Sequence, residues 1–179
     1  WGLNVAGVTG NTADSGHGWF TLDLDIYDQA KVEAITAIAE ETFGYSPLRR
    51  GRHSVAKLSV IYRRPACALQ VASRWVLDGT FAGKEEVVEI QDGGLPTTLF
   101  GRHHETGEFF IWPDRSPLNA GPGVAPVIDE AKFLKFIGRV HAVYPIRDFD
   151  KLIGGKAASL SVDWLDTDVA DLRVPAMAD

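Results

Sequence analysis

Hydrophobic and polar residues follow two different periods along the chain, and the change of period marks the expected elements. Residues 19–26 (WFTLDLDI) are an apolar run interrupted by acids at alternate positions, which is typical of a strand. From Asp28 onwards the apolar residues recur at helical spacing as far as Phe43. We therefore expect a strand followed by a helix, with Asp28 as the N-cap and Gly44 as the residue that ends the helix.

Further elements follow the same signals. Short apolar and β-branched runs predict strands at residues 4–9, 57–62, 86–90, 97–100 and 108–112. A second helical pattern runs from Asp129 to Val143. Residues 68–77 fit either a strand or a short helix, and a weak signal indicates one more short strand at 159–162. This mixture of many short strands with few helices indicates the α+β fold class.

Length and composition limit the classes of protein. With 179 residues, 45% of them apolar, the chain can bury a core, and we expect residues 1–179 to form a single domain. The single cysteine, Cys67, excludes an internal disulfide and fits a reducing compartment. No apolar run approaches the roughly 20 residues that cross a bilayer, and no signal segment opens the chain. We therefore expect a cytoplasmic protein without a membrane partner.

Basic residues are concentrated in one segment. The formal net charge of −6 argues at first against a nucleic-acid partner. However, residues 49–64 (RRGRHSVAKLSVIYRR) contain six Lys and Arg residues and no acid. The distribution of charge matters more than its sum, so we interpret this segment as a phosphate-facing patch. A plain basic surface strand remains the alternative.

Two carboxylates, Asp23 and Asp25, lie in the middle of the first long strand. Burying an unpaired carboxylate is costly, so the pair needs a cation, hydrogen-bond donors or an open cleft. Residues i and i+2 of a strand share a face, which sets the two acids roughly 6–7 Å apart at Cα. This arrangement is typical of a two-metal phosphoryl-transfer site that uses Mg²⁺ or Mn²⁺. The pattern alone is weak, because sugar transferases, haloacid-type phosphatases and solvated edge strands also carry it.

A third acid strengthens this hypothesis. Glu89 lies in the apolar run VVEIQ, where a carboxylate again needs a reason. If that strand neighbours the first, Glu89 completes a carboxylate triad with Asp23 and Asp25. The alternative is an outward-facing residue of an alternating strand.

Three segments, taken in order, resemble the bifunctional primase–polymerase (prim-pol) domain of phage and plasmid replication proteins, in the archaeo-eukaryotic primase superfamily. They are TLDLDIYD, PLRRGRHSVAKLSVIYR, and VVEIQDGG with the following GRHHETGEFFIWP. Asp23 and Asp25 match the first motif of the family, and Glu89 matches the third. The phage branch also carries a Gly-x-His-x-x-Thr-Gly stretch before an aromatic-Trp strand, which residues 101–112 match. The resemblance covers residues 2–140.

The second motif departs from the family pattern, in which a Ser-x-His precedes a strand and the His contacts the phosphates of the incoming nucleotide. Here Arg49, Arg52 and Lys57 resemble a variant Arg-x-Gly-Arg…Lys pattern. Guanidinium and ammonium groups both bind triphosphate oxygens, so the resemblance implies a phosphate site at these residues. His53 is the other candidate for the role of the histidine, and His103 is either a nucleotide contact or a plain surface residue.

The resemblance implies an RRM-like catalytic sheet with helices, a second small α/β lobe, and an active-site cleft between them. It implies primer synthesis and extension on single-stranded DNA from nucleoside triphosphates, with Asp23, Asp25 and Glu89 holding two Mg²⁺ or Mn²⁺ ions. Arg63 or Arg64 would contact the template backbone. We also expect a fused or associated helicase, and expect the chain to be a fragment of a longer replication protein.

Two other functions stay open. A metal-dependent nuclease or phosphohydrolase would use the same acids on a water nucleophile, although the sequence offers no clear general base for it. A non-catalytic nucleic-acid-binding module would keep the fold without the chemistry.

Overall fold

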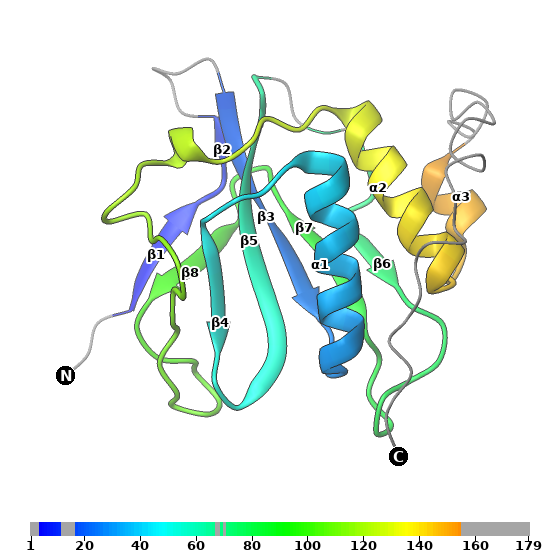
Figure 1. Cartoon of the computed structure of the whole chain (residues 1–179), viewed down its shortest axis with the longest axis horizontal. Helices are drawn as coiled ribbons and strands as arrows, with labels where there is room; N and C mark the ends of the chain where they lie inside the picture. Colours follow the sequence, from blue (N-terminus) through cyan, green and yellow to red (C-terminus); the bar gives the residue numbers. More distant parts are fainter. Residues whose placement is uncertain (1–3, 12–16, 67–68, 70, 155–179) are drawn as a thin grey trace.

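A six-stranded antiparallel sheet forms the centre of the computed structural model, which describes residues 4–11, 17–66, 69 and 71–154 (Figure 1). In this described part the strand order is β4-β5-β3-β7-β6, and β2 pairs with the beginning of β3. The strands are β2 (Gly10–Asn11), β3 (His17–Asp25), β4 (Arg49–Arg52), β5 (Val55–Pro65), β6 (Arg74–Val76) and β7 (Val87–Gln91).

Two helices, α1 (Gln29–Phe43) and α2 (Glu130–Val143), pack against one face of this sheet (Figure 1). The short helix α3 (Phe149–Ile153) follows α2 in the chain, and a 3₁₀ turn, η1 (Pro122–Val124), precedes α2. None of the helices in the described residues is long and apolar enough to cross a membrane.

The predicted helix ends are confirmed. The Asp28 carboxylate accepts hydrogen bonds from two backbone N–H groups of the first turn of α1. Gly44 ends that helix with a φ of 89°, a conformation that favours glycine. Asp129 caps α2 in the same way, by accepting from the backbone N–H of Lys132.

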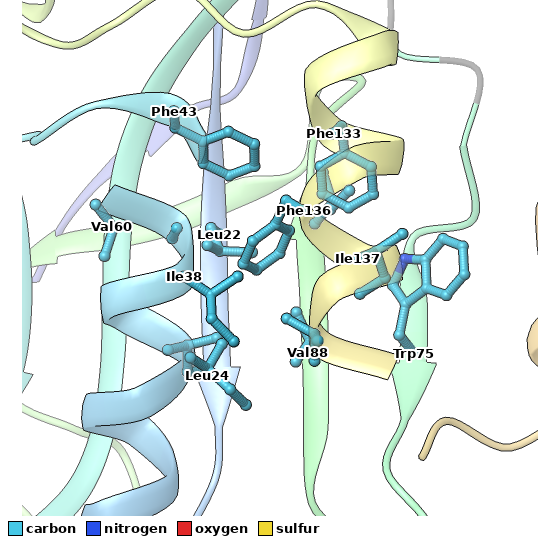
Figure 2. Packing of buried hydrophobic residues seen from close by; sticks show 14 of the residues in the cluster. Leu22, Leu24, Ile38, Phe43, Val60, Trp75, Val88, Phe133, Phe136 and Ile137 are labelled. Atoms are coloured by element: carbon cyan, nitrogen blue, oxygen red, sulfur yellow. The ribbon is translucent and has the colours of Figure 1, made fainter. Parts of the chain in front are cut away.

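The helix-covered face of the sheet holds the main hydrophobic core (Figure 2). The strands contribute Leu22, Leu24, Val60 and Val88, and the helices contribute Ile38, Phe43, Phe136 and Ile137, all of them 4% exposed or less. Successive residues of a strand point to opposite faces. Asp23 and Asp25, which alternate with the two leucines of β3, therefore belong to the other, helix-free face.

A smaller sheet covers one end of the helix-free face. It consists of β1 (Val5–Val8) and β8 (Pro96–Phe100), which pair antiparallel. A second apolar cluster lies beneath it and comprises Leu48, Ile61, Ala120 and Ala125, with Trp19, Leu99 and Trp112 packed against them. The helix-free face is therefore apolar and covered at this end, whereas the end that carries the two aspartates is polar.

The α+β class is confirmed, as are the strands expected at 4–9, 57–62, 86–90 and 97–100. The ambiguous segment contains a strand, β6. Residues 108–112 differ from the prediction, because they form isolated bridges, from Ile111 to Gly51 and from Phe109 to Arg102, instead of a regular strand. The strand expected at 159–162 lies outside the described residues.

The expected second lobe is only partly present. In Figure 1, β1 and β8 lie at the left, and all three α-helices lie nearer the centre and right. Within the described residues the extensive helix contacts are those of α1 with α2 and with β5. The smaller sheet is therefore a β-structure without an α-helix of its own in the part of the chain that is described.

Candidate active site

A row of five polar side chains crosses the helix-free face of the sheet. In the strand registers, Arg50 of β4 is opposite Ser59 of β5, and Ser59 is opposite Asp23 of β3. On the other side, Asp23 is opposite Glu89 of β7, and Glu89 is opposite Arg74 of β6. Because directly opposite residues share a face, two of the predicted acids, Asp23 and Glu89, are neighbours, and Asp25 lies two positions along the same strand.

Asp23 stands at the centre of this row and is partly buried. Its carboxylate accepts hydrogen bonds from the Ser59 hydroxyl and, at 3.3 Å, from the side-chain amide of Gln91. Burial raises the pKa of this carboxyl. The Ser59 hydrogen bond and the charge of Arg50 oppose that effect, but the net pKa stays raised. The charged form of Asp23 is therefore held at a cost that a nearby cation would relieve.

Asp25 has a cation of its own. It forms an ion pair with Lys57 of β5. The Lys57 ammonium also donates to the Tyr27 hydroxyl at 3.0 Å and lies 4.2 Å from the centre of the Tyr27 ring. Burial lowers the pKa of Lys57, but the hydrogen bonds to Asp25 and Tyr27 outweigh it, and the net pKa is raised. Lys57 is therefore fully charged at neutral pH.

Glu89 binds a different partner, the Arg74 guanidinium, which donates to its Oε1 at 2.6 Å. Among the residues that the structure describes, no group of three or more His, Cys, Asp or Glu side chains is placed to hold one metal ion. The predicted triad thus occurs as three neighbouring acids on one face, each held by a side-chain donor.

A pocket of about 130 Å³ opens beside the two aspartates, and we call it the acid–base pocket. Its lining includes five predicted site residues, Asp23, Asp25, Arg52, Lys57 and His103. Arg50, Ser59 and Phe110 line it as well, and the sequence prediction had not included them. The pocket therefore combines two carboxylates with three cationic side chains and an imidazole, a set that can bind a metal ion and an anionic phosphate side by side.

Residues 101–112 form one side of the pocket and are held in place by contacts with β4 and with Asn4. Ile111 exchanges two backbone hydrogen bonds of 3.0 Å with Gly51, at the edge of β4. Gly101 has a φ of 115°, and a Cβ at this position would lie 2.0 Å from the side-chain oxygen of Asn4. The first glycine of the Gly-x-His-x-x-Thr-Gly stretch is therefore required by close packing.

His103 and Phe110 reach the pocket from this segment. Their rings meet edge to face at 6.0 Å, and the Arg50 guanidinium lies 4.4 Å from the centre of the Phe110 ring. Burial and the nearby charge of Arg52 lower the pKa of His103. Its imidazole is therefore neutral at neutral pH and offers one donor and one acceptor.

A more open hollow of about 520 Å³ adjoins the acid–base pocket and shares Arg52 with it; we call it the side groove. It is also lined by Tyr27, Gln29, His53, Ser54, Val55, Ala56 and Phe81. Phe81 is 43% exposed, and Lys84 lies 4.7 Å from the centre of the Tyr27 ring. His53 therefore belongs to the side groove and does not line the acid–base pocket.

Arg49 was predicted to bind phosphate together with Arg52 and Lys57, but it does not line the acid–base pocket as they do. Its guanidinium pairs with Glu40 of α1, donates to the Ser46 carbonyl at 2.9 Å, and lies 4.4 Å from the centre of the Tyr45 ring. Because neighbouring residues of a strand point to opposite faces, the next residue, Arg50, takes that place.

The two arginines expected to contact DNA are engaged within the fold. Arg64 is 2% exposed and forms an ion pair of 2.7 Å with Asp92. A buried, paired guanidinium does not face a DNA backbone, so the prediction for Arg64 is corrected. Arg63 is partly buried, and its Nε donates to the Ala125 carbonyl at 2.7 Å.

Glu86 is a further residue that the sequence analysis missed. It is 2% exposed, and its carboxylate accepts hydrogen bonds from the backbone N–H groups of Tyr27 (2.9 Å) and Asp28 (3.1 Å) and from the Lys31 ammonium. This contact fixes the turn that leads from β3 into α1, directly after Asp25. The adjacent acids Glu85 and Glu86 look alike in sequence, and only the strand phase of β7 distinguishes the buried one.

Comparison of the chain with protein-family models, with curated proteins and with solved structures gave no match.

Proposed function

We propose that the chain is the catalytic domain of a DNA primase–polymerase, which transfers nucleotides from nucleoside triphosphates onto a DNA-templated primer. One observation carries this proposal: Asp23 and Asp25 share a pocket with Arg52 and Lys57. Nucleotidyl transfer needs carboxylates for divalent ions next to cations for the triphosphate, because the negative charge of the phosphates must be neutralised as the bond forms.

The donor set fits Mg²⁺ or Mn²⁺. Both ions prefer oxygen ligands, and Asp23 and Asp25 supply carboxylate oxygens from one face of β3. The raised pKa of Asp23 marks a carboxylate that lacks full compensation by the protein. Asp23 and Asp25 would hold the ions, with Glu89 as the third acid of the row. When bound, two such ions would lower the pKa of the primer 3′-hydroxyl and neutralise the leaving pyrophosphate.

The cationic side of the pocket would bind the triphosphate. Arg52 can donate a bidentate fork to phosphate oxygens, and Lys57 supplies a compact charge. Neutral His103 can donate one further hydrogen bond without adding charge. Arg50 has another role, because its guanidinium donates to Ser59 at 2.7 Å, and Ser59 donates to Asp23. We assign Arg50 and Ser59 to the positioning of the Asp23 carboxylate.

The nucleic-acid strand would lie in the side groove. This groove shares Arg52 with the acid–base pocket, and Phe81 offers an exposed ring for stacking a base. Lys84 adds positive charge beside Tyr27. We therefore assign contact with the template strand to this groove instead of to Arg63 and Arg64.

The finer description of the fold belongs to the same proposal. An RRM-like sheet is supported by the central strands β4-β5-β3-β7, with helices on one face and polar side chains on the other. One feature departs from a simple repeat of the strand–helix–strand unit. Such a repeat would place the second helix, α2, before β7 in the chain, whereas α2 follows β7 here.

A primer-extension reaction tests the proposal. The chain is incubated with a 5′-labelled primer on a longer template, Mn²⁺ or Mg²⁺, and the four deoxynucleoside triphosphates or ribonucleoside triphosphates. We expect products longer than the primer with the natural chain and none with Asp25→Asn. Shortened primer without extension would identify a nuclease, and DNA binding without any change of length would identify a non-catalytic module; either result would refute the proposal.

A further inference from the structure

The acids of the helix-free face are already occupied by positive charges of the chain itself. Glu89 is held by Arg74, Asp25 is held by Lys57, and Asp23 is linked to Arg50 through Ser59. Only one of these cations, Lys57, both lines the acid–base pocket and forms a direct ion pair with an acid of that pocket.

The ion pair with Asp25 and the role that the proposed function gives to Lys57 compete for the same ammonium group. The proposed function gives its ammonium to the triphosphate and gives the Asp25 carboxylate to a divalent ion. Lys57 pairs with one oxygen of the Asp25 carboxylate, and a divalent ion on the same carboxylate would lie close to the ammonium. The repulsion between the two positive groups makes the ammonium and the metal ion compete for Asp25.

We propose that Lys57 is an internal occupant of the cation site: its ammonium holds Asp25 until a divalent ion displaces it, and the released ammonium then binds the triphosphate. The inference rests on the proposed function. Its consequence is linked binding, in which the divalent ion and the phosphate each raise the affinity of the chain for the other.

The surroundings of Lys57 suit such an exchange. Its side chain is 24% exposed and that of Asp25 is 39% exposed, so an incoming ion can reach the pair from solvent. The Tyr27 hydroxyl at 3.0 Å and the Tyr27 ring at 4.2 Å are contacts that the ammonium keeps after it leaves Asp25. The unbranched lysine stem allows this movement, whereas the Arg50 guanidinium is held by both Ser59 and the Phe110 ring.

Lys84 provides a matched control. Its ammonium also lies over the Tyr27 ring, at 4.7 Å, but among the described residues it forms no ion pair with an acid. Replacing either lysine by methionine removes one positive charge and keeps the apolar stem. The difference between the two variants therefore isolates the ion pair with Asp25 from the general loss of charge.

The test is a titration of the full chain with Mn²⁺, in which the signal of free Mn²⁺ is followed by electron paramagnetic resonance. We expect Lys57→Met to bind Mn²⁺ about two to five times more tightly than the natural chain, because an ion pair of about 0.4–1 kcal/mol no longer competes. Lys84→Met should change the affinity less. Lys57→Arg, whose fork grips a carboxylate more firmly, should bind Mn²⁺ more weakly than the natural chain.

The outcomes separate the two proposals. If the natural chain binds Mn²⁺ but Lys57→Met binds it no more tightly than Lys84→Met does, the internal-occupant inference is overturned and the proposed function stands. If the natural chain and every variant fail to bind Mn²⁺, both are overturned. Urea unfolding of each variant checks that it is folded. If Lys57→Met is not folded, Lys57→Arg still tests the inference.

The linkage itself has a second readout. Sulfate serves as a phosphate-sized anion, and potassium chloride of equal ionic strength serves as its control. We expect sulfate to tighten Mn²⁺ binding by the natural chain and by Lys84→Met, and to have a smaller effect on Lys57→Met. An equal sulfate effect in all three proteins would contradict the release of the ammonium.

Discussion

The two faces of the central sheet are built from the same strands but serve different ends. On one face of β3, Leu22 and Leu24 are fully buried under the helices. On the other, Asp23 and Asp25 line a polar pocket. Because a strand alternates between its faces, a shift of one position in the sequence moves a residue from the core to the proposed chemistry. Substitutions on the first face should change stability, and those on the second should change binding.

The helix-free face repeats this contrast along its length. At one end, Trp19 and Ile61 are covered by the smaller sheet, and at the other end the acids remain accessible. Gln91 joins the two ends, since its side chain accepts a hydrogen bond from Thr97 of β8 at 2.5 Å and donates to Asp23 at 3.3 Å. The covering strand thus also orients a neighbour of the central acid.

The largest effect is expected on the helix-covered face. Phe136 of α2 is fully buried, with its ring 4.8 Å from that of Phe43 of α1, so Phe136→Ala should lower the free energy of unfolding by about 3–5 kcal/mol. Phe109, which is 55% exposed, is the matched control, and Phe109→Ala should change this free energy by less than about 0.5 kcal/mol. Urea unfolding followed by circular dichroism measures both. Similar losses in the two variants would remove the distinction between the faces.

A smaller loss is expected at the buried glutamate beside the site. Glu86→Ala leaves two backbone N–H groups and the Lys31 ammonium without their acceptor, which should cost about 2–3 kcal/mol in urea unfolding. The neighbouring Glu85 is exposed, and Glu85→Ala should be nearly neutral. Equal stability of the two variants would show that Glu86 does not fix the turn after Asp25.

The pH dependence of stability should distinguish Asp23 from the core. Its folded-state pKa is raised above the ordinary value of 3.8, so the folded chain binds this proton more tightly than the unfolded chain does. The free energy of unfolding therefore gains a contribution as the pH falls from above the raised pKa towards 3.8. Asp23→Asn lacks this contribution. Urea unfolding of both proteins over a range of pH should therefore show that the natural chain becomes more stable relative to Asp23→Asn as the pH falls. A difference that does not vary with pH would contradict the raised pKa.

The smallest effect is expected in the side groove. Phe81→Ala should weaken the binding of a fluorescent single-stranded oligonucleotide about fivefold, corresponding to about 1 kcal/mol of lost stacking. Phe109→Ala removes another exposed ring outside the groove and should leave this affinity unchanged. Fluorescence anisotropy at fixed salt measures both. If Phe109→Ala weakens binding more, the strand lies elsewhere.

Much of the fold follows from local patterns. The periods locate β3, α1 and α2, and Asp28 and Asp129 mark the helix starts because side-chain caps are local interactions. Residues 108–112 have a strand-like pattern, but only isolated bridges form there, since the pairing depends on the distant edge of β4. Local propensity does not determine such long-range pairing.

The site was predictable only where the acids and bases lie on known strand faces. The i, i+2 spacing correctly sets Asp23 and Asp25 on one face. Ser59 was not predicted as a site residue, because its place opposite Asp23 depends on the register between two strands, which neither strand encodes alone. Arg49 was chosen in place of Arg50 from a motif, although strand alternation distinguishes them once the face is known.

Nucleotide incorporation by Asp23→Asn, compared with that by the natural chain on the same primer and template with Mn²⁺, tests the proposed chemistry of the helix-free face. We expect incorporation to fall at least about a hundredfold, because the variant lacks a charged metal ligand. Urea unfolding at neutral pH should show that the variant remains folded. Incorporation at the natural rate by a folded Asp23→Asn would contradict the claim that the helix-free face carries the chemistry.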